Sequence, residues 1–386
     1  MIDRLKRFDY LSFLATVLLM AVGTVAIWSA GAARAEALFH GMWINALVTG
    51  VCGLAVYFVL AFTDYRRYLN LLAFPAYGGA VACLIAVLLF GSTVYGGRRW
   101  LWFFQPSEIS KLAVLMFLAV LYGGDRAAGL RSFRGFVLGM ALLGVPALLI
   151  LLEPDLGTAL TLVPAAVLLL FAAGVWRRGI VTIVAIGVFS VFAVLGAVYE
   201  AEKPGVSVER RERILRCVPL KPHQLQRVQV FLFPERDSRD AGYNLLQAKI
   251  SIGSGGLRGK GLGKGESNHL KYLPQAISMN DFIFCVWAEE TGYRGAVVLL
   301  VLFAVLLMGG CRAACLASDA RGRYFALGFS TLLFAHVYIN IAMSIGLVPI
   351  TGLPLPFISS GRTFLVTVLI GLGLIQSIVI HREETR

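Results

Sequence analysis

Long runs of apolar residues, separated by short polar segments, repeat along almost the whole chain. Runs of about 18 or more such residues recur, and a run of that length can cross a ~30 Å hydrocarbon core as a helix. We predict ten membrane-spanning helices, at residues 10–30, 41–62, 71–90, 108–123, 135–152, 158–175, 179–200, 283–310, 324–349 and 363–380. The chain is therefore expected to be an all-α polytopic membrane protein, with residues 1–386 forming one integral membrane domain.

Composition supports this fold class. Hydrophobic residues make up 58% of the chain and charged residues only 15%, and the mean hydropathy is +0.77. These values lie outside the range of soluble globular proteins. The net charge of +13 does not indicate a nucleic-acid partner here, because the basic residues are spread over the connections between apolar runs.

The basic residues concentrate in alternate short connections, which predicts the orientation of the helices. Under the positive-inside rule the basic connections face the cytoplasm. Both termini are then cytoplasmic, which requires an even number of spans. The basic positions are Arg4, Lys6, Arg7, Arg66, Arg67, Arg126, Arg131, Arg134, Arg177, Arg178, Arg312, Arg321, Arg323, Arg382 and Arg386.

One connection, at about residues 201–281 between the seventh and eighth spans, is far longer than the others and is predicted to lie outside the cell. It carries fourteen Lys and Arg residues, and long loops cross the membrane largely regardless of charge. A cationic outer surface suits an anionic partner such as a lipid phosphate or diphosphate. Two short amphipathic helices are predicted within it, at 206–218 and 243–252.

A glycine cluster from Gly253 to Gly265 follows the second of these helices. Neither a P-loop nor a G-x-G-x-x-G register fits it, so nucleotide binding is excluded. Two interpretations stay open. Backbone N–H groups with Arg258, Lys260 and Lys264 form a cradle for a diphosphate, or the segment is a mobile loop without a ligand.

Asp281, at the end of the long connection, is the leading candidate for a catalytic acid or base. The alternative is an N-cap of the helix that follows. On a helix Cys285 and Ala288 would share the face of Asp281, and their small side chains would leave room for a substrate.

Other charged residues near the outer ends of the spans have both structural and functional interpretations. Glu108 and Lys111, three residues apart, share a helix face and form an ion pair, or Lys111 contacts an anionic group. Asp155 in the turn EPDLGT caps the next helix or helps to bind a divalent cation. Glu290 and Arg294 are expected to pair at i,i+4.

His336 within the ninth span is expected to make an interhelical hydrogen bond. Of six cysteines only Cys217 falls in the long connection, so a disulfide framework there is excluded. No Ser-His-Asp or metal-ligand motif is present in the sequence. The residues alone thus fit three classes: an enzyme acting on a lipid-linked substrate, a transporter or flippase, and an assembly scaffold.

Three segments resemble the SEDS family (shape, elongation, division and sporulation proteins). They are GRRWLWFFQPSEISKLA at Gly97–Ala113, EPDLGTAL at Glu153–Leu160, and the block from Gly242 to Gly292 that contains GYNLLQAKISIGSGGLRGKGLGKG and NDFIFCVWAEETG. The segment LKPHQLQRVQVFLFPERD before this block resembles the RodA branch more than the FtsW branch. The likeness covers nearly the whole chain.

The resemblance implies a peptidoglycan glycosyltransferase of the bacterial cytoplasmic membrane, with an outward-facing active site that polymerises lipid II and releases undecaprenyl diphosphate. It also implies a class B penicillin-binding protein and other elongation-complex membrane proteins as partners. A lipid II flippase and a division or sporulation polymerase are the alternatives. No organic cofactor is expected, whereas a divalent cation, Mg²⁺ or Mn²⁺, suits diphosphate chemistry.

The resemblance also assigns residues. Asp281 matches the family's essential acid, and Glu108 and Lys111 match its charged pair in QPSE-x-x-K. The candidate substrate-binding residues are Glu108, Lys111, Lys249, Arg258, Lys260, Lys264 and Arg99, and the candidate metal ligand is Asp155.

The run LPLPFISSGRTF at Leu353–Phe364 departs from the family's LPFVSYGGSS. Ser360 replaces an aromatic residue there, and Arg362 and Thr363 replace small ones. We expect this departure to alter the local loop without touching Asp281.

Overall fold

The computed structural model describes residues 2–32, 41–94, 97–102, 104–236, 241–266 and 278–382. Within these residues nine helices are long and apolar enough to cross a membrane, and α8, with 17 residues, is a shorter tenth. The prediction of an all-α membrane fold with about ten spans is therefore confirmed. The ten helices are α2 (Tyr10–Ala32), α4 (Met42–Phe62), α5 (Tyr65–Phe90), α6 (Pro106–Gly123), α7 (Phe133–Leu152), α8 (Leu156–Ala172), α9 (Arg177–Ala201), α15 (Ile283–Leu316), α16 (Ala320–Ser344) and α17 (Arg362–Ile380).

Smaller elements lie between the spans. Both helices predicted in the long connection are present, as α10 (Val208–Arg216) and α12 (Ala241–Ser254). A third helix, α11 (Pro222–Leu232), was not predicted, although its proline stands in the first turn, where a missing N–H costs nothing. The remaining small elements are α1 (Ile2–Lys6), the antiparallel hairpin of β1 (Ser92–Val94) and β2 (Gly97–Trp100), and the 3₁₀ turns η1 (Asp125–Arg131) and η2 (Pro234–Arg236).

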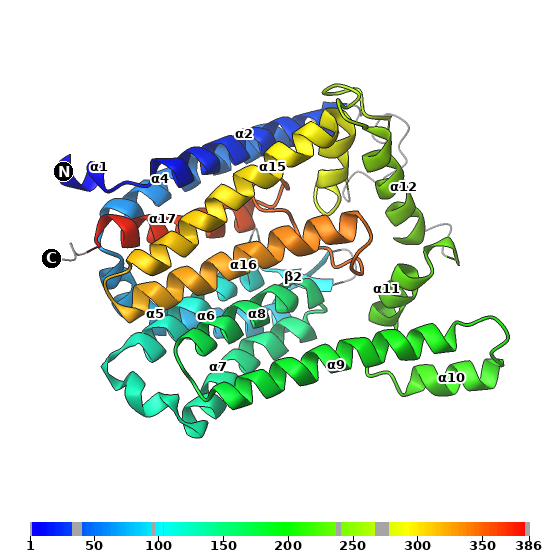
Figure 1. Ribbon diagram of the computed structural model, residues 1–386, viewed down its shortest axis with the longest axis horizontal. Coiled ribbons are helices and arrows are strands. Elements are labelled where there is room, and N and C mark those ends of the chain that lie inside the picture. The colour runs from blue at the N-terminus through cyan, green and yellow to red at the C-terminus, as the bar shows by residue number, and fades with distance from the viewer. Residues whose placement is uncertain are drawn as a thin grey trace.

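The two ends of the described chain lie at the same end of the helical bundle (Figure 1). Arg7 donates a hydrogen bond to the backbone oxygen of Arg382 over 2.6 Å. Helices α10, α11 and α12 lie at the opposite end. This arrangement agrees with an even number of crossings and with a long connection on the side away from the termini.

The spans differ strongly in burial. Helices α6 and α17 form the centre, with 78% and 83% of their most apolar windows buried, whereas the corresponding value for α9 is 6%. Helix α9 therefore stands at the edge of the bundle, and its apolar side chains face outward, as expected of a helix that contacts lipid.

Helix α15 reverses direction at Gly292, whose φ of 68° and ψ of −167° are not helical. Trp287 donates a hydrogen bond from Nε1 to the backbone oxygen of Gly295, 3.1 Å away. In a continuous helix these residues would be ~12 Å apart along the axis. The predicted span 283–310 is thus wrong in its first part, because Ile283–Thr291 forms a short arm that turns back beside the long arm (Figure 1).

The glycine cluster holds this reversal in place. Lys260 N and Gly261 N donate to the backbone oxygens of Glu289 and Glu290, at 3.1 and 2.9 Å. A Cβ on Gly259 would lie 2.1 Å from the oxygen of Glu290, and one on Gly292 would lie 2.4 Å from the nitrogen of Gly259. Only glycine permits so close an approach, so the glycine cluster is an ordered clasp on α15.

Candidate active site

The backbone around Asp281 is fixed by two other segments of the bundle. Asn340 of α16 donates hydrogen bonds from Nδ2 to the backbone oxygens of Asp281 and Leu353, at 2.9 and 2.7 Å. The Ser359 hydroxyl donates to the backbone oxygen of Asn280 over 2.6 Å, and the Ser360 hydroxyl donates to its side-chain oxygen. The departure at Ser360 therefore contacts Asn280, the residue before Asp281, and the structure describes no contact of Ser360 with Asp281 itself.

Asp281 does not cap α15. The cap position is Phe282, and no side chain of the described residues makes a capping hydrogen bond there. The room expected beside Cys285 and Ala288 is also absent, because Cys285 packs against Ala248 of α12 and both residues are buried. Small side chains on this face allow two helices to pack closely and do not make space for a substrate.

Charged side chains from three other elements surround the partly buried carboxylate of Asp281. Arg227 of α11 donates from Nη1 to the backbone oxygen of Thr351 over 3.2 Å. The neighbouring Gly352 is so close that a Cβ there would lie 3.5 Å from Oδ2 of Asp281. Arg227, Arg99 of β2 and Asp155 at the start of α8 all act electrostatically on Asp281.

Burial raises the pKa of Asp281 from 3.8 to about 6, and Asp155 adds to the rise, whereas Arg227 and Arg99 lower it. A carboxylate with this pKa is ionised at neutral pH and binds a proton more strongly than an exposed aspartate. These are the properties of a general base that works near pH 7.

Within the part of the chain that the structure describes, Arg99 and Arg227 are the cations that act on Asp281. Arg99 donates from Nε to the backbone oxygen of Glu153 over 3.3 Å and from Nη2 to that of Pro154. Sequence reasoning included Arg99 among the substrate-binding candidates but missed Arg227. Arg227 is one of fourteen basic residues in the long connection, and no local sequence pattern distinguishes it from the other thirteen.

Asp155 is the N-cap of α8, as one of the two sequence interpretations predicted. Its Oδ1 accepts from Thr158 N, and its Oδ2 accepts from the Thr158 hydroxyl, the Gln105 amide and the Ser107 hydroxyl. In the described part of the chain no three His, Cys, Asp or Glu side chains cluster as metal ligands. These residues do not by themselves fit a resident divalent cation, and metal binding by Asp155 stays a prediction.

Glu153 is a further carboxyl group that sequence reasoning read only as part of a turn. It is fully buried, and among the described residues neither of its side-chain oxygens has a hydrogen-bond partner. Burial and the nearby Asp155 raise its pKa to about 8, although Arg99 lowers it. With a pKa of about 8, Glu153 is mostly protonated at pH 7, so it adds little negative charge beside Arg99.

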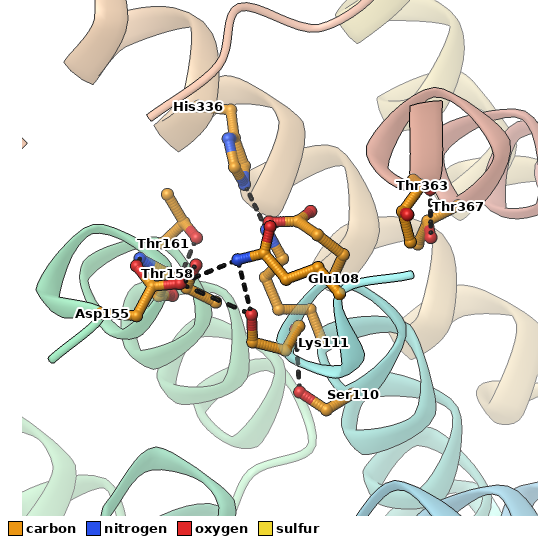
Figure 2. Close-up of polar contacts among 11 residues, drawn as sticks. Glu108, Ser110, Lys111, Asp155, Thr158, Thr161, His336, Thr363 and Thr367 are labelled. Atoms are coloured by element: carbon orange, nitrogen blue, oxygen red, sulfur yellow. Dashed lines mark hydrogen bonds and ion pairs between the residues drawn. The ribbon is translucent and has the colours of Figure 1, made fainter. Parts of the chain in front are cut away.

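A second polar group lies within the bundle between α6 and α16 (Figure 2). Lys111 Nζ is 2.9 Å from Glu108 Oε2 and 2.8 Å from Nε2 of His336, and the ring of Phe364 lies 5.0 Å away. The predicted ion pair and the predicted interhelical bond of His336 are confirmed. The Lys111 side chain is 0% exposed, so its direct contact with a diphosphate stays a prediction.

The other candidate cations lie elsewhere. Lys260 Nζ binds Glu289 at 2.9 Å and Glu266 at 3.3 Å, so its charge serves the clasp on α15 and not an open anion site. Arg258, Lys264 and Lys249 are exposed. None of the three is among the charges that shift the pKa of Asp281 within the described residues.

The predicted pair of Glu290 and Arg294 is wrong. Gly292 lies between them, so the helical spacing on which the pairing depends is broken. Glu290 instead accepts a hydrogen bond from the hydroxyl of Ser29 at the end of α2. This contact ties the reversal of α15 to the first span, at the end of α2 away from the N-terminus.

Comparisons with known proteins agree with this architecture. The peptidoglycan glycosyltransferase MrdB of Escherichia coli K12 is 34% identical over 95% of this chain and 91% of its own length. A chain in a solved peptidoglycan synthase complex, described as coordinating polymerisation and crosslinking, is 28% identical with a TM-score of 0.73, covering 98% of this chain and 99% of that one. The rod shape determining protein RodA of Thermus thermophilus is 27% identical with a TM-score of 0.65, and 98% of each chain is covered.

The family model for the cell cycle proteins FtsW, RodA and SpoVE matches residues 9–384, which is nearly the whole chain. The chain therefore belongs to this family of cell cycle proteins.

Proposed function

We propose that this protein is a peptidoglycan glycosyltransferase that polymerises lipid II at the outer face of the bacterial cytoplasmic membrane. The name of the 34% identical relative supports this activity. The observation that carries the proposal is the partly buried Asp281, which has a pKa of about 6 and lies beside Arg227 and Arg99. A base next to two cations suits a reaction that removes a proton and releases a diphosphate.

In the proposed reaction, Asp281 accepts the proton of the 4-hydroxyl group on the acceptor's terminal N-acetylglucosamine. The hydroxyl oxygen forms a bond to the anomeric carbon of the donor as the bond from that carbon to the diphosphate oxygen breaks. Undecaprenyl diphosphate leaves with the electron pair of the broken bond. A general base of this kind contributes ~10²–10⁴-fold to the rate.

Arg227 and Arg99 are the residues best located to stabilise the leaving diphosphate, since both act on the same carboxylate. A guanidinium group can donate two parallel hydrogen bonds to a phosphate. This assignment replaces Lys260, whose ammonium group is bound to Glu289 and Glu266. A divalent cation, Mg²⁺ or Mn²⁺, would add to this charge stabilisation, since Mg²⁺ is commonly held by one or two carboxylates together with substrate phosphates.

For the cellular role we propose glycan synthesis during elongation, together with a class B penicillin-binding protein. The similar chain in a complex that coordinates polymerisation and crosslinking supports such a partner. The similarity to a rod shape determining protein and the RodA-like segment before Gly242 support elongation. A division or sporulation role is the alternative, because the matching family also includes FtsW and SpoVE.

The test is polymerisation of purified lipid II by the full-length protein, alone and with its candidate partner. Wild type is expected to make glycan strands, and Asp281→Asn to make at least ~10²-fold fewer while remaining folded. Normal turnover by Asp281→Asn would remove this residue from the mechanism. If neither protein makes glycan, yet both move lipid II across liposome bilayers, the flippase alternative replaces the polymerase.

A further inference from the structure

Glu202, the C-cap residue that follows α9, is the centre of a charged cluster separate from the site around Asp281. Its side chain is buried, and its Oε1 accepts from Arg211 at 2.7 Å and from Gln229 at 2.9 Å. Its Oε2 accepts from Arg236 at 2.7 Å, and Arg236 also donates to its backbone oxygen. One carboxylate thus joins the end of α9 to α10, α11 and η2.

Aromatic packing strengthens the same junction. The rings of Tyr199 and Phe233 stack with their centroids 5.9 Å apart, and the guanidinium group of Arg236 lies 4.6 Å above Phe233. An open pocket of about 230 Å³ remains beside Glu202 and Phe233.

Helix α11 faces two groups at once. Gln229 points to Glu202, whereas Arg227 bonds to Thr351 beside the site. Two residues along a helix are turned ~200° from each other, so these side chains leave opposite faces of α11. The position of α11 relative to Glu202 therefore sets where Arg227 lies relative to Asp281.

We propose that Glu202 is a positioning residue that holds α11 against the end of α9 so that Arg227 faces Asp281. The proposal rests on the proposed function for its catalytic consequence but not for its geometry. Helix α9 is the least buried of the nine long apolar helices in the described residues, so it has few packing contacts to hold it. The Glu202 cluster fixes the end of α9 next to α11, and the position of that end therefore affects where Arg227 lies relative to Asp281.

The expected consequence is electrostatic. The groups that act on Asp281 are Arg227 from α11, Arg99 from β2 and Asp155 from α8, and the two arginines lower its pKa. If Glu202 no longer holds α11, Arg227 moves away and the pKa of Asp281 rises above its value of about 6. A rise of about one unit would reduce the ionised fraction about twofold at pH 7 and about fivefold at pH 6.

The test measures lipid II polymerisation from pH 5 to 8.5 with the full-length protein in nanodiscs. Glu202→Gln is expected to move the acid limb of the profile upward by about one pH unit. The matched control is Glu212→Gln on α10, which removes an equal charge from an exposed i,i+4 pair with Arg216 and should leave the profile unchanged. Equal shifts in both variants, or no shift in Glu202→Gln, would overturn the proposal.

A double variant separates positioning from a general loss of structure. If Glu202 acts through Arg227, the Glu202→Gln change adds no further shift of the acid limb in an Arg227→Gln background. Additive shifts would mean that Glu202 acts by another route. If Glu202→Gln does not fold, Glu202→Asp replaces it in the test, because it keeps the charge and only shortens the side chain. A smaller shift of the acid limb in the same direction is then expected.

A measurement without turnover distinguishes failure of this proposal from failure of the proposed function. Infrared titration isolates the Asp281 carboxyl group by subtraction of the Asp281→Asn spectrum. Glu202→Gln should raise the pKa of that group even if the protein makes no glycan. An unchanged pKa in an active protein would overturn the role of Glu202 alone.

Discussion

Lys111 donates a hydrogen bond from its ammonium group to Nε2 of His336, 2.8 Å away, and so joins α6 to α16 inside the bundle. Because an ammonium group can only donate, Nε2 is the acceptor and His336 is neutral with its proton on Nδ1. Glu108, 2.9 Å from the same ammonium, supplies the compensating charge. The stability of the pair therefore depends on the presence of both charges.

Removing one charge of this pair is expected to cost more than removing both. Lys111→Met leaves the carboxylate of Glu108 buried and unpaired, which typically costs about 3–5 kcal/mol. The double variant Glu108→Gln/Lys111→Met removes both charges and should unfold at a higher temperature than Lys111→Met alone. Thermal unfolding of the detergent-purified proteins measures this order, and a double variant less stable than the single one would contradict it.

Asp281→Asn is expected to stabilise the protein in a pH-dependent manner. The pKa of Asp281 is raised from 3.8 to about 6 in the folded state, so between these values the folded protein binds more protons than the unfolded chain. Stability contributed by this group is present below about pH 4 and falls as the pH rises through about 6. The variant should therefore unfold at a higher temperature than wild type at pH 7.5, and the difference should shrink at pH 4.5. An equal rise in unfolding temperature at both pH values would contradict the destabilisation of the Asp281 carboxylate by burial.

The clasp on α15 should depend on glycine at two of its positions. A methyl group at Gly259 or Gly292 would meet backbone atoms closer than 2.5 Å, and both residues have positive φ. Gly259→Ala and Gly292→Ala are therefore expected to lower the yield of folded protein sharply. Gly253→Ala is the control, because Gly253 lies in α12 with nothing within 4 Å. Size-exclusion profiles of the three variants measure the effect, and wild-type behaviour of Gly292→Ala would disprove the reversal.

Substitutions of Lys260 and Lys264 are expected to have different effects on stability, although both residues follow a glycine in the same loop. Lys260→Gln breaks two ion pairs, one of them to the buried Glu289, so it should lower the unfolding temperature without a selective rise in KM for lipid II. Lys264 is exposed, and Lys264→Gln should leave stability unchanged. A rise in KM with normal stability for Lys260→Gln would return this lysine to the substrate-binding residues.

The spans and the candidate acid could be predicted because they depend on local or periodic signals. Apolar runs mark helices such as α7 and α9, and the motif before Ile283 marked Asp281. Hydropathy could not show the reversal of α15, since the short arm and the long arm are both apolar. The reversal depends on a close contact between Gly259 and Gly292. These glycines are far apart in sequence, and they contribute little to a hydropathy average.

Charge roles in the long connection could not be assigned from sequence for a similar reason. Arg227, Lys260 and Arg211 all carry a positive charge, and their neighbours along the chain do not indicate which group each will contact. Their roles differ because α11 directs Arg227 toward Thr351 and the clasp brings Lys260 to Glu289, while the end of α9 brings Glu202 to Arg211. Each of these contacts joins segments that only the folded bundle brings together.

The reversal at Gly292 also determines how far the acid lies from the end of the bundle at which α15 turns back. A straight α15 of 34 residues would be ~51 Å long, about 20 Å more than a hydrocarbon core. The long arm from Tyr293 to Leu316, ~36 Å, fits the bilayer with moderate tilt. The short arm returns ~13 Å toward the bilayer interior, with Asp281 just before its first residue. Asp281 is thus recessed below the turn at Gly292. Under the proposed function, this depth would let the head group of a lipid-linked substrate reach the acid while the lipid chain stays in the membrane.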